Sequence, residues 1–169
     1  VLTLVVNCFS HILNQASIPF QIQISGLEEI VRYTQPEQVV VDLSEQKAQD
    51  VADRMAEDAG EEPMLVLGAD TVVAWEGEIM GKPRDPQEAY EMLNKLQGST
   101  HQVFTGVTLI LLDKNGKENK KNTKISFYEK TDVVMYPMTE MEIREYIATG
   151  EPMDKAGAYA IQGKCALYI

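Results

Sequence analysis

The chain has 169 residues, with 15 Lys and Arg against 26 Asp and Glu, so its formal charge is −11 at neutral pH. Proteins that grip the nucleic-acid backbone use clustered Lys and Arg, so this balance argues against a nucleic-acid polymer as partner. The length suits one domain that needs no disulfide, and Cys8 and Cys165 form no CxxC pair. The apolar run at residues 1–6 is too short to span a bilayer, which predicts a cytoplasmic protein with no membrane partner.

The first half of the chain alternates predicted strands and helices. The pattern favours strands at residues 1–6, 18–24 and 64–67, and helices at residues 10–16 and 38–59. The longer helix rests on apolar residues at three- and four-residue spacing, and Gly60 is expected to stop it. The strand at residues 64–67 is expected to end at Gly68-Ala69-Asp70-Thr71.

The second half is predicted to mix hairpins with two capped helices. Strands are expected at residues 72–75, 78–80, 103–112, 124–136 and 166–169, and helices at residues 86–96 and 140–149. Asp85-Pro86-Gln87-Glu88 combines an N-cap, a proline and a capping-box acid, and Thr139 with Glu142 repeats the capping signal. Asn115-Gly116 predicts a turn between two long strands. The mixture indicates an α/β fold with a mixed sheet in a single domain, residues 1–169.

Three places carry residues suited to chemistry. Asp70 is expected at the carboxyl end of a strand, where open α/β sheets gather ligands, although an Asp that satisfies a turn explains the position equally well. Lys82 stands between a glycine and a proline and suits a phosphate, although most lysines are simply solvated. The loop at residues 154–163 offers the amide of Gln162 and glycines that let backbone N–H groups approach a ligand, while turn formation is the commoner explanation of those glycines.

Several reaction classes drop out at this stage. The sequence has no zinc-spaced His and Cys, no GxxxxGK[ST] loop and no nucleophile-elbow serine. What remains is a set of carboxylates and lysines suited to chemistry on phosphates with a hard cation. The carboxylates are Glu28, Glu29, Asp70 and Asp154, and the lysines are Lys47, Lys82 and Lys155.

Four motifs resemble the Maf (septum-formation-inhibitor) family of nucleoside triphosphate pyrophosphatases. They stand at residues 67–71 (Leu-Gly-Ala-Asp-Thr), 81–83 (Gly-Lys-Pro), 101–107 (His-Gln-Val-Phe-Thr-Gly-Val) and 151–159 (Glu-Pro-Met-Asp-Lys-Ala-Gly-Ala-Tyr). The resemblance covers roughly residues 18–169. It implies a fold similar to inosine-triphosphate pyrophosphatases: a mixed twisted sheet with flanking helices in two lobes around a cleft.

The resemblance also implies an activity and a set of roles. The activity is hydrolysis of a nucleoside triphosphate to the monophosphate and pyrophosphate with a divalent metal, Mg²⁺ or Mn²⁺, in a homodimer. Ile161-Gln162-Gly163 resembles the branch that acts on dTTP and UTP. The implied catalytic residues are Asp70, Lys82 and Glu29; the implied substrate-binding residues are Lys47, Thr71, Lys155 and Gln162; and Glu29 and Asp70 are the implied metal ligands.

The chain departs from the family pattern near both ends. The Ser-x-Ser-Pro-Arg-Arg segment that binds the triphosphate is replaced by Leu4, Val6, Asn7, Cys8 and Phe9, and the chain stops at Ile169, before the usual closing helix. Two readings therefore stay open. In the first, Asp70 or a metal-bound water supplies the nucleophile of a pyrophosphatase. In the second, the chain is a catalytically silent scaffold that binds nucleotide or a partner, because lost arginines cost about 1.5–3 kcal/mol per charge-assisted hydrogen bond.

Overall fold

The computed structural model describes residues 2–5, 9–58, 63–112 and 123–169. Within these ranges the strands join one mixed sheet in the order β2-β1-β3-β5-β6, with β4 paired to β3. Its strands are β1 (Leu2–Leu4), β2 (Phe20–Ile22), β3 (Met64–Trp75), β4 (Glu78–Met80), β5 (Thr100–Leu112) and β6 (Thr123–Val134). Its α-helices are α1 (Ser10–Gln15), α2 (Pro36–Asp58), α3 (Pro86–Leu96) and α4 (Glu140–Ala148). This architecture confirms the predicted mixed α/β class.

Backbone contacts divide the chain into two compact units. The first unit contains residues 1–70 and 105–129, and the second contains residues 71–104 and 130–169. The strands β3, β5 and β6 each contribute residues to both units. None of the helices in the described residues is long and apolar enough to cross a membrane.

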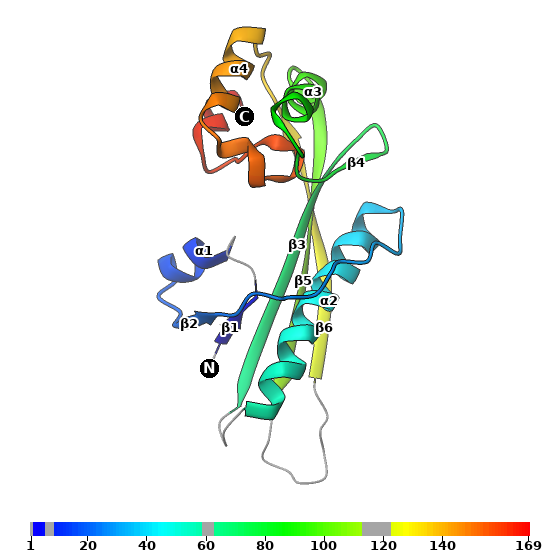
Figure 1. Ribbon diagram of the computed structural model, residues 1–169, viewed down its shortest axis with the longest axis vertical. Helices are drawn as coiled ribbons and strands as arrows, with labels where there is room; N and C mark the ends of the chain where they lie inside the picture. The colour runs from blue at the N-terminus through cyan, green and yellow to red at the C-terminus, as the bar shows by residue number, and fades with distance from the viewer. Residues whose placement is uncertain (1, 6–8, 59–62, 113–122) are drawn as a thin grey trace. The chain divides into compact units, whose positions relative to one another are not determined.

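The first unit is built on helix α2, which runs along the strands of its sheet (Figure 1). Strand β1 pairs in parallel with both β2 and β3. Two glycines bring the helix unusually close to the strands: a Cβ on Gly68 would lie 2.6 Å from the Ser44 carbonyl oxygen, and one on Gly106 would lie 2.1 Å from the Val40 carbonyl oxygen. The core between them is apolar and consists of Val5, Ala48, Val51, Ala52, Val66, Ile110 and Leu112.

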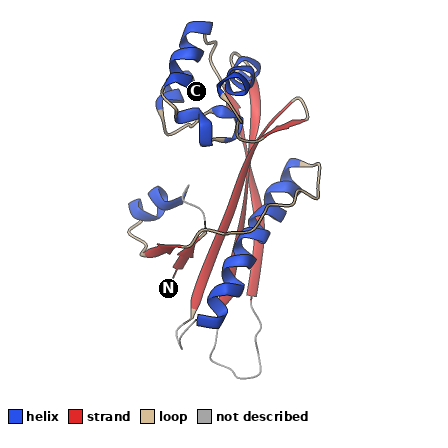
Figure 2. Ribbon diagram, viewed as in Figure 1, coloured by secondary structure: helices blue, strands red, loops and turns tan. Residues whose placement is uncertain are grey.

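The second unit packs α3 and α4 beside a C-terminal segment of 3₁₀ turns, η2 (Glu151–Asp154), η3 (Ala156–Ala158) and η4 (Lys164–Tyr168) (Figure 2). Both predicted caps are present. The Asp85 side chain accepts the Glu88 N–H, and Thr139 and Glu142 form the full reciprocal capping box. The Glu88 carboxylate accepts from the Arg84 backbone instead of closing a box with Asp85. The core includes Val73, Leu93, Leu96, Met135, Ile143, Tyr146 and Cys165.

Two predictions about strands were wrong. Residues 166–169 form no strand, because i→i+3 bonds such as Ala166 N–H to the Gly163 carbonyl coil this segment into η4. The strand predicted to end at Leu67 continues without a break to Trp75. Gly68 is there because α2 lies against it, and not because the chain turns. The predicted Asn115-Gly116 turn, the stop at Gly60 and Cys8 lie outside the described residues.

Candidate active site

Asp70 lies in the interior of β3, and this corrects the prediction that it follows the end of a strand. Gly68 precedes it by two residues, so both face the same side of the sheet. Because Gly68 meets α2 at the Ser44 carbonyl and at Ala48, that side is the one that carries the helix. Asp70 therefore faces α2, close to its third turn.

Lys47 of α2 connects the two carboxylates that were predicted as metal ligands. Its Nζ donates to Asp70 Oδ1 at 2.5 Å and lies 2.9 Å from Glu29 Oε1. The side chains of Lys47 and Asp70 are only 14% and 13% exposed, whereas that of Glu29 is 48% exposed. The structure thus brings together three residues that are 18 and 23 positions apart in the chain, with the ammonium shared by two carboxylates.

The charge of Lys47 is stabilised by this arrangement. Burial by itself would lower the pKa of the ammonium, but the charges and hydrogen bonds of Asp70 and Glu29 outweigh it and hold the pKa above its ordinary value. Lys47 therefore stays positively charged at every physiological pH.

Glu29 belongs to a segment without regular secondary structure, residues 23–35, that lies along α2. Four polar helix residues spaced four apart hold it: Asp42, Gln46, Asp50 and Arg54. We call these residues the α2 stripe. Their contacts are Arg32 to Asp42 at 3.1 Å, the Ile30 backbone to Gln46 at 2.8 and 3.1 Å, Ser25 to Asp50 at 2.8 Å, and the Ile24 carbonyl to Arg54 at 2.9 Å.

The contact with Gln46 matters most for the site because it involves the residue next to Glu29. The Gln46 amide both donates to the Ile30 carbonyl and accepts from the Ile30 N–H, as a neighbouring strand would. The sequence analysis missed the α2 stripe. Its signal was present as polar residues at i, i+4 spacing, which align on one helix face.

In the second unit, Lys82 and Lys155 lie on two segments that are tied together. The Gly157 N–H donates to the Gly81 carbonyl at 3.0 Å. Lys155 Nζ lies 2.7 Å from Asp154 Oδ1. This hydrogen bond holds the pKa of Asp154 below its ordinary value, and the charge of Lys82 adds to the effect. The unit therefore groups Lys82, predicted as catalytic, and Lys155, predicted to bind substrate, with the carboxylate of Asp154.

The other predicted binding residues are exposed and also belong to the second unit. Thr71 follows Asp70 on β3, and Gln162 lies in the turn between η3 and η4. Gly157 lies at φ +65°, and a Cβ there would meet Val73 at 2.7 Å, so packing and backbone shape account for this glycine. Glu28 is exposed, and the ion pairs of Lys47 are with Glu29 and Asp70 instead.

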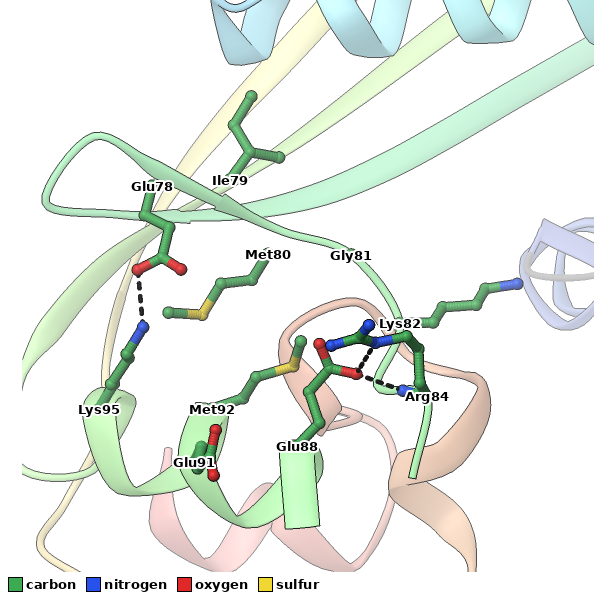
Figure 3. A pocket seen from close by; sticks show the side chains of 10 residues that line it. All are labelled: Glu78, Ile79, Met80, Gly81, Lys82, Arg84, Glu88, Glu91, Met92 and Lys95. Atoms are coloured by element: carbon green, nitrogen blue, oxygen red, sulfur yellow. Dashed lines mark hydrogen bonds and ion pairs between the residues drawn. The ribbon is translucent and has the colours of Figure 1, made fainter. Parts of the chain in front are cut away.

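A pocket of about 260 Å³ lies between β4 and α3 in the second unit (Figure 3). Ion pairs close it at two sides, Glu78 with Lys95 at 2.7 Å and Arg84 with Glu88 at 2.9 Å. Figure 3 shows the Lys82 side chain pointing away from these pairs. Arg84 and Lys95 are thus each paired with an acid of the pocket, and Lys82, which also lines it, takes part in neither pair.

The described residues contain no cluster of three or more His, Cys, Asp or Glu side chains that could hold a metal by themselves. Glu29 and Asp70 supply two carboxylates at Lys47. Magnesium is commonly bound by one or two carboxylates, with substrate phosphates and water completing its shell. The donor set therefore fits Mg²⁺ that arrives with a phosphate ligand.

Known proteins resemble this chain over most of its length. Three curated relatives are named dTTP/UTP pyrophosphatase: from Agathobacter rectalis (46% identical, 94% of this chain and 79% of that protein), Bacillus cytotoxicus (43%, 94% and 76%) and Lachnoclostridium phytofermentans (42%, 94% and 76%). A solved nucleoside-triphosphatase / dITP/XTP pyrophosphatase from Mycobacterium abscessus is a distant likeness, 10% identical with a TM-score of 0.39 over 82% of this chain and 76% of that chain. The family model described as Maf-like protein matches residues 10–169. This chain therefore belongs to the Maf-like protein family.

Proposed function

We propose that this protein hydrolyses dTTP and UTP to the nucleoside monophosphate and pyrophosphate. The names of the curated relatives support the substrates. The observation that carries the proposal is the contact of Lys47 with both Asp70 and Glu29, because it gathers two carboxylates and an ammonium group at one point of a Maf-like chain.

In this reaction, water attacks the α-phosphorus and the bond to the α,β-bridging oxygen breaks, so pyrophosphate leaves. The Asp70 carboxylate accepts the proton of the attacking water. Lys47 keeps that carboxylate oriented through its 2.5 Å hydrogen bond and adds positive charge beside the phosphates. Its raised pKa supports this role, because the lysine does not compete with Asp70 as a base.

Glu29 and Asp70 would hold a divalent cation, Mg²⁺ or Mn²⁺. When bound, such a cation offsets phosphate charge and lowers the pKa of water. In the second unit, Lys82 and Lys155 would contact the phosphates, and Thr71 with Gln162 would select the base. The amide of Gln162 offers both a donor and an acceptor, which suits the edge of a pyrimidine. A homodimer and a cytoplasmic location, where nucleotide pools lie, complete the proposal.

The test is a product analysis with the purified chain. Each of dTTP, UTP, dCTP, dATP and dGTP is incubated with Mg²⁺, with Mn²⁺ or with EDTA, and monophosphate, pyrophosphate and orthophosphate are quantified. We expect equal amounts of monophosphate and pyrophosphate from dTTP and UTP, and none with EDTA. Release of orthophosphate would contradict the proposed bond cleavage, and binding without turnover would favour the silent scaffold.

A further inference from the structure

The Glu151 carboxylate joins the two ends of the loop at residues 151–164. Its oxygens accept the Lys164 N–H at 3.0 and 3.2 Å, and Oε1 also accepts from Tyr146 Oη at 2.9 Å. The same tyrosine oxygen accepts the Ala160 N–H at 3.2 Å. One acidic side chain therefore satisfies two backbone groups of the loop, one directly and one through Tyr146, which is buried.

Gly163 indicates that this contact is tightly built. A Cβ on Gly163 would lie 2.0 Å from Glu151 Oε1 and 2.5 Å from Cδ. Its φ is −118°, which any residue adopts, so close approach to the carboxylate is the reason for a glycine here.

The loop is also anchored in its middle. Tyr159 Oη lies 2.7 Å from His101 Nε2, and both residues are buried. Between this anchor and the Glu151 contact, the chain leaves the core at Ile161 and Gln162, both of which are exposed. The loop thus presents Gln162 from a short span that is fixed on both sides.

We propose that Glu151 is a positioning residue that sets the base preference of the protein by fixing the span that carries Gln162. The inference rests on the proposed function, in which Gln162 contacts the base. No substrate contact is assigned to Glu151 itself. Its carboxylate acts through the Lys164 N–H and through Tyr146.

The test measures equilibrium binding of α,β-imido-dUTP and α,β-imido-dGTP, which do not turn over, together with kcat/KM for dTTP and dGTP. We expect Glu151→Ala to reduce the pyrimidine preference about tenfold, a loss of about 1.4 kcal/mol in discrimination. Glu151→Gln keeps an acceptor for the Lys164 N–H and should restore most of the preference. Glu145→Ala, an exposed acid of α4, is the matched control and should leave the preference unchanged.

Three further results decide the outcome. If Glu151→Ala lowers only the melting temperature and keeps the preference, the residue is merely structural and the inference is overturned. Equal binding of both analogues by the unmodified chain overturns it as well. If the unmodified chain prefers α,β-imido-dUTP but does not hydrolyse dTTP, the proposed catalysis fails while the role of Glu151 is still decided by binding.

A second variant guards against misfolding. Gly163→Ala should disturb the preference in the unmodified background, because its methyl group displaces the carboxylate. In the Glu151→Ala background the same change should have a much smaller effect, since the clashing group is gone. Equal effects in both backgrounds would contradict the contact.

Discussion

The two units hold their site residues by different means. In the first unit, Glu29, Lys47 and Asp70 come from three separate segments and meet through their own charged groups. In the second, Lys82 and Lys155 belong to two segments joined by a backbone hydrogen bond from the Gly157 N–H to the Gly81 carbonyl. Their ammonium groups do not take part in this hydrogen bond. Charge changes in the first unit therefore alter the chemistry and the contacts among these three side chains, whereas in the second unit the lysines can be removed without loss of the hydrogen bond that joins their segments.

The largest expected effect is that of Asp70→Asn. It removes the charge and the basic oxygen that the proposed reaction needs, so turnover should fall about 10²- to 10⁴-fold. The change preserves shape, and Lys47 keeps Glu29 as a partner, so the melting temperature should shift little. Steady-state kinetics and thermal unfolding measure the two effects. Asp53→Asn on the exposed side of α2 is the control and should leave turnover unchanged. Unchanged turnover in Asp70→Asn would contradict the catalytic role of Asp70.

Next comes Lys82→Ala in the second unit. Loss of a charge-assisted hydrogen bond of about 1.5–3 kcal/mol should lower kcat/KM for dTTP roughly 10- to 150-fold. Lys82 is exposed, so stability should hold. Lys130→Ala, another exposed lysine of this unit, should change neither quantity. A collapse of thermal stability in Lys82→Ala would break the comparison, because it would make the lysine part of the scaffold.

Packing in the first unit is tested by Gly106→Ala. The added methyl would lie 2.1 Å from the Val40 carbonyl oxygen, so α2 must shift. We expect a loss of about 1–3 kcal/mol in the free energy of unfolding, measured in urea, and a weaker Lys47 to Asp70 contact as a consequence. Gly26→Ala meets no atom within 4 Å and serves as the control. Equal stability of the two variants would argue against close packing of the helix.

The smallest effect should come from Gln46→Ala. It removes two hydrogen bonds to the Ile30 backbone, worth about 0.5–1.5 kcal/mol each, and loosens Glu29. We expect a several-fold rise in the Mg²⁺ concentration needed for half-maximal turnover, with kcat at saturating Mg²⁺ nearly unchanged. A matching change in Gln49→Ala, a neighbour on α2 outside the stripe, would show that the effect is not specific.

Local signals in the sequence predicted the helices well and the strands less well. The N-terminal ends of α3 and α4 follow from N-caps that involve residues three apart. Asp85 and Thr139 each accept the backbone N–H of the residue three positions later, as predicted. The continuity of β3 could not be predicted, because Gly68 is explained only by a helix that begins about 30 residues earlier. The terminal apolar run, read as a strand, proved to be η4, because an apolar run this short does not distinguish a strand from a 3₁₀ turn.

The candidate site was accessible mainly through family motifs. From the sequence, Asp70 fitted a functional role and a structural role in a turn equally well. Only the structure shows that its carboxylate pairs with Lys47, among all the lysines of the chain. The roles of the α2 stripe and of Glu151 were missed, since a pattern along one segment does not identify the partners that it meets in another, whether side chains or backbone groups.

Between Asp42 and Gln46, the α2 stripe also matches the extended segment in length. Four helical residues advance about 6 Å along the axis, and two extended residues advance about 6.6 Å. Arg32 and Ile30 therefore fall in step with Asp42 and Gln46. Insertion of one residue in the extended segment would carry Glu29 about 3.3 Å past Lys47. Insertion in the helix between Gln46 and Lys47 would turn the ammonium by about 100°. We therefore expect length changes in either segment to be tolerated only when both change together.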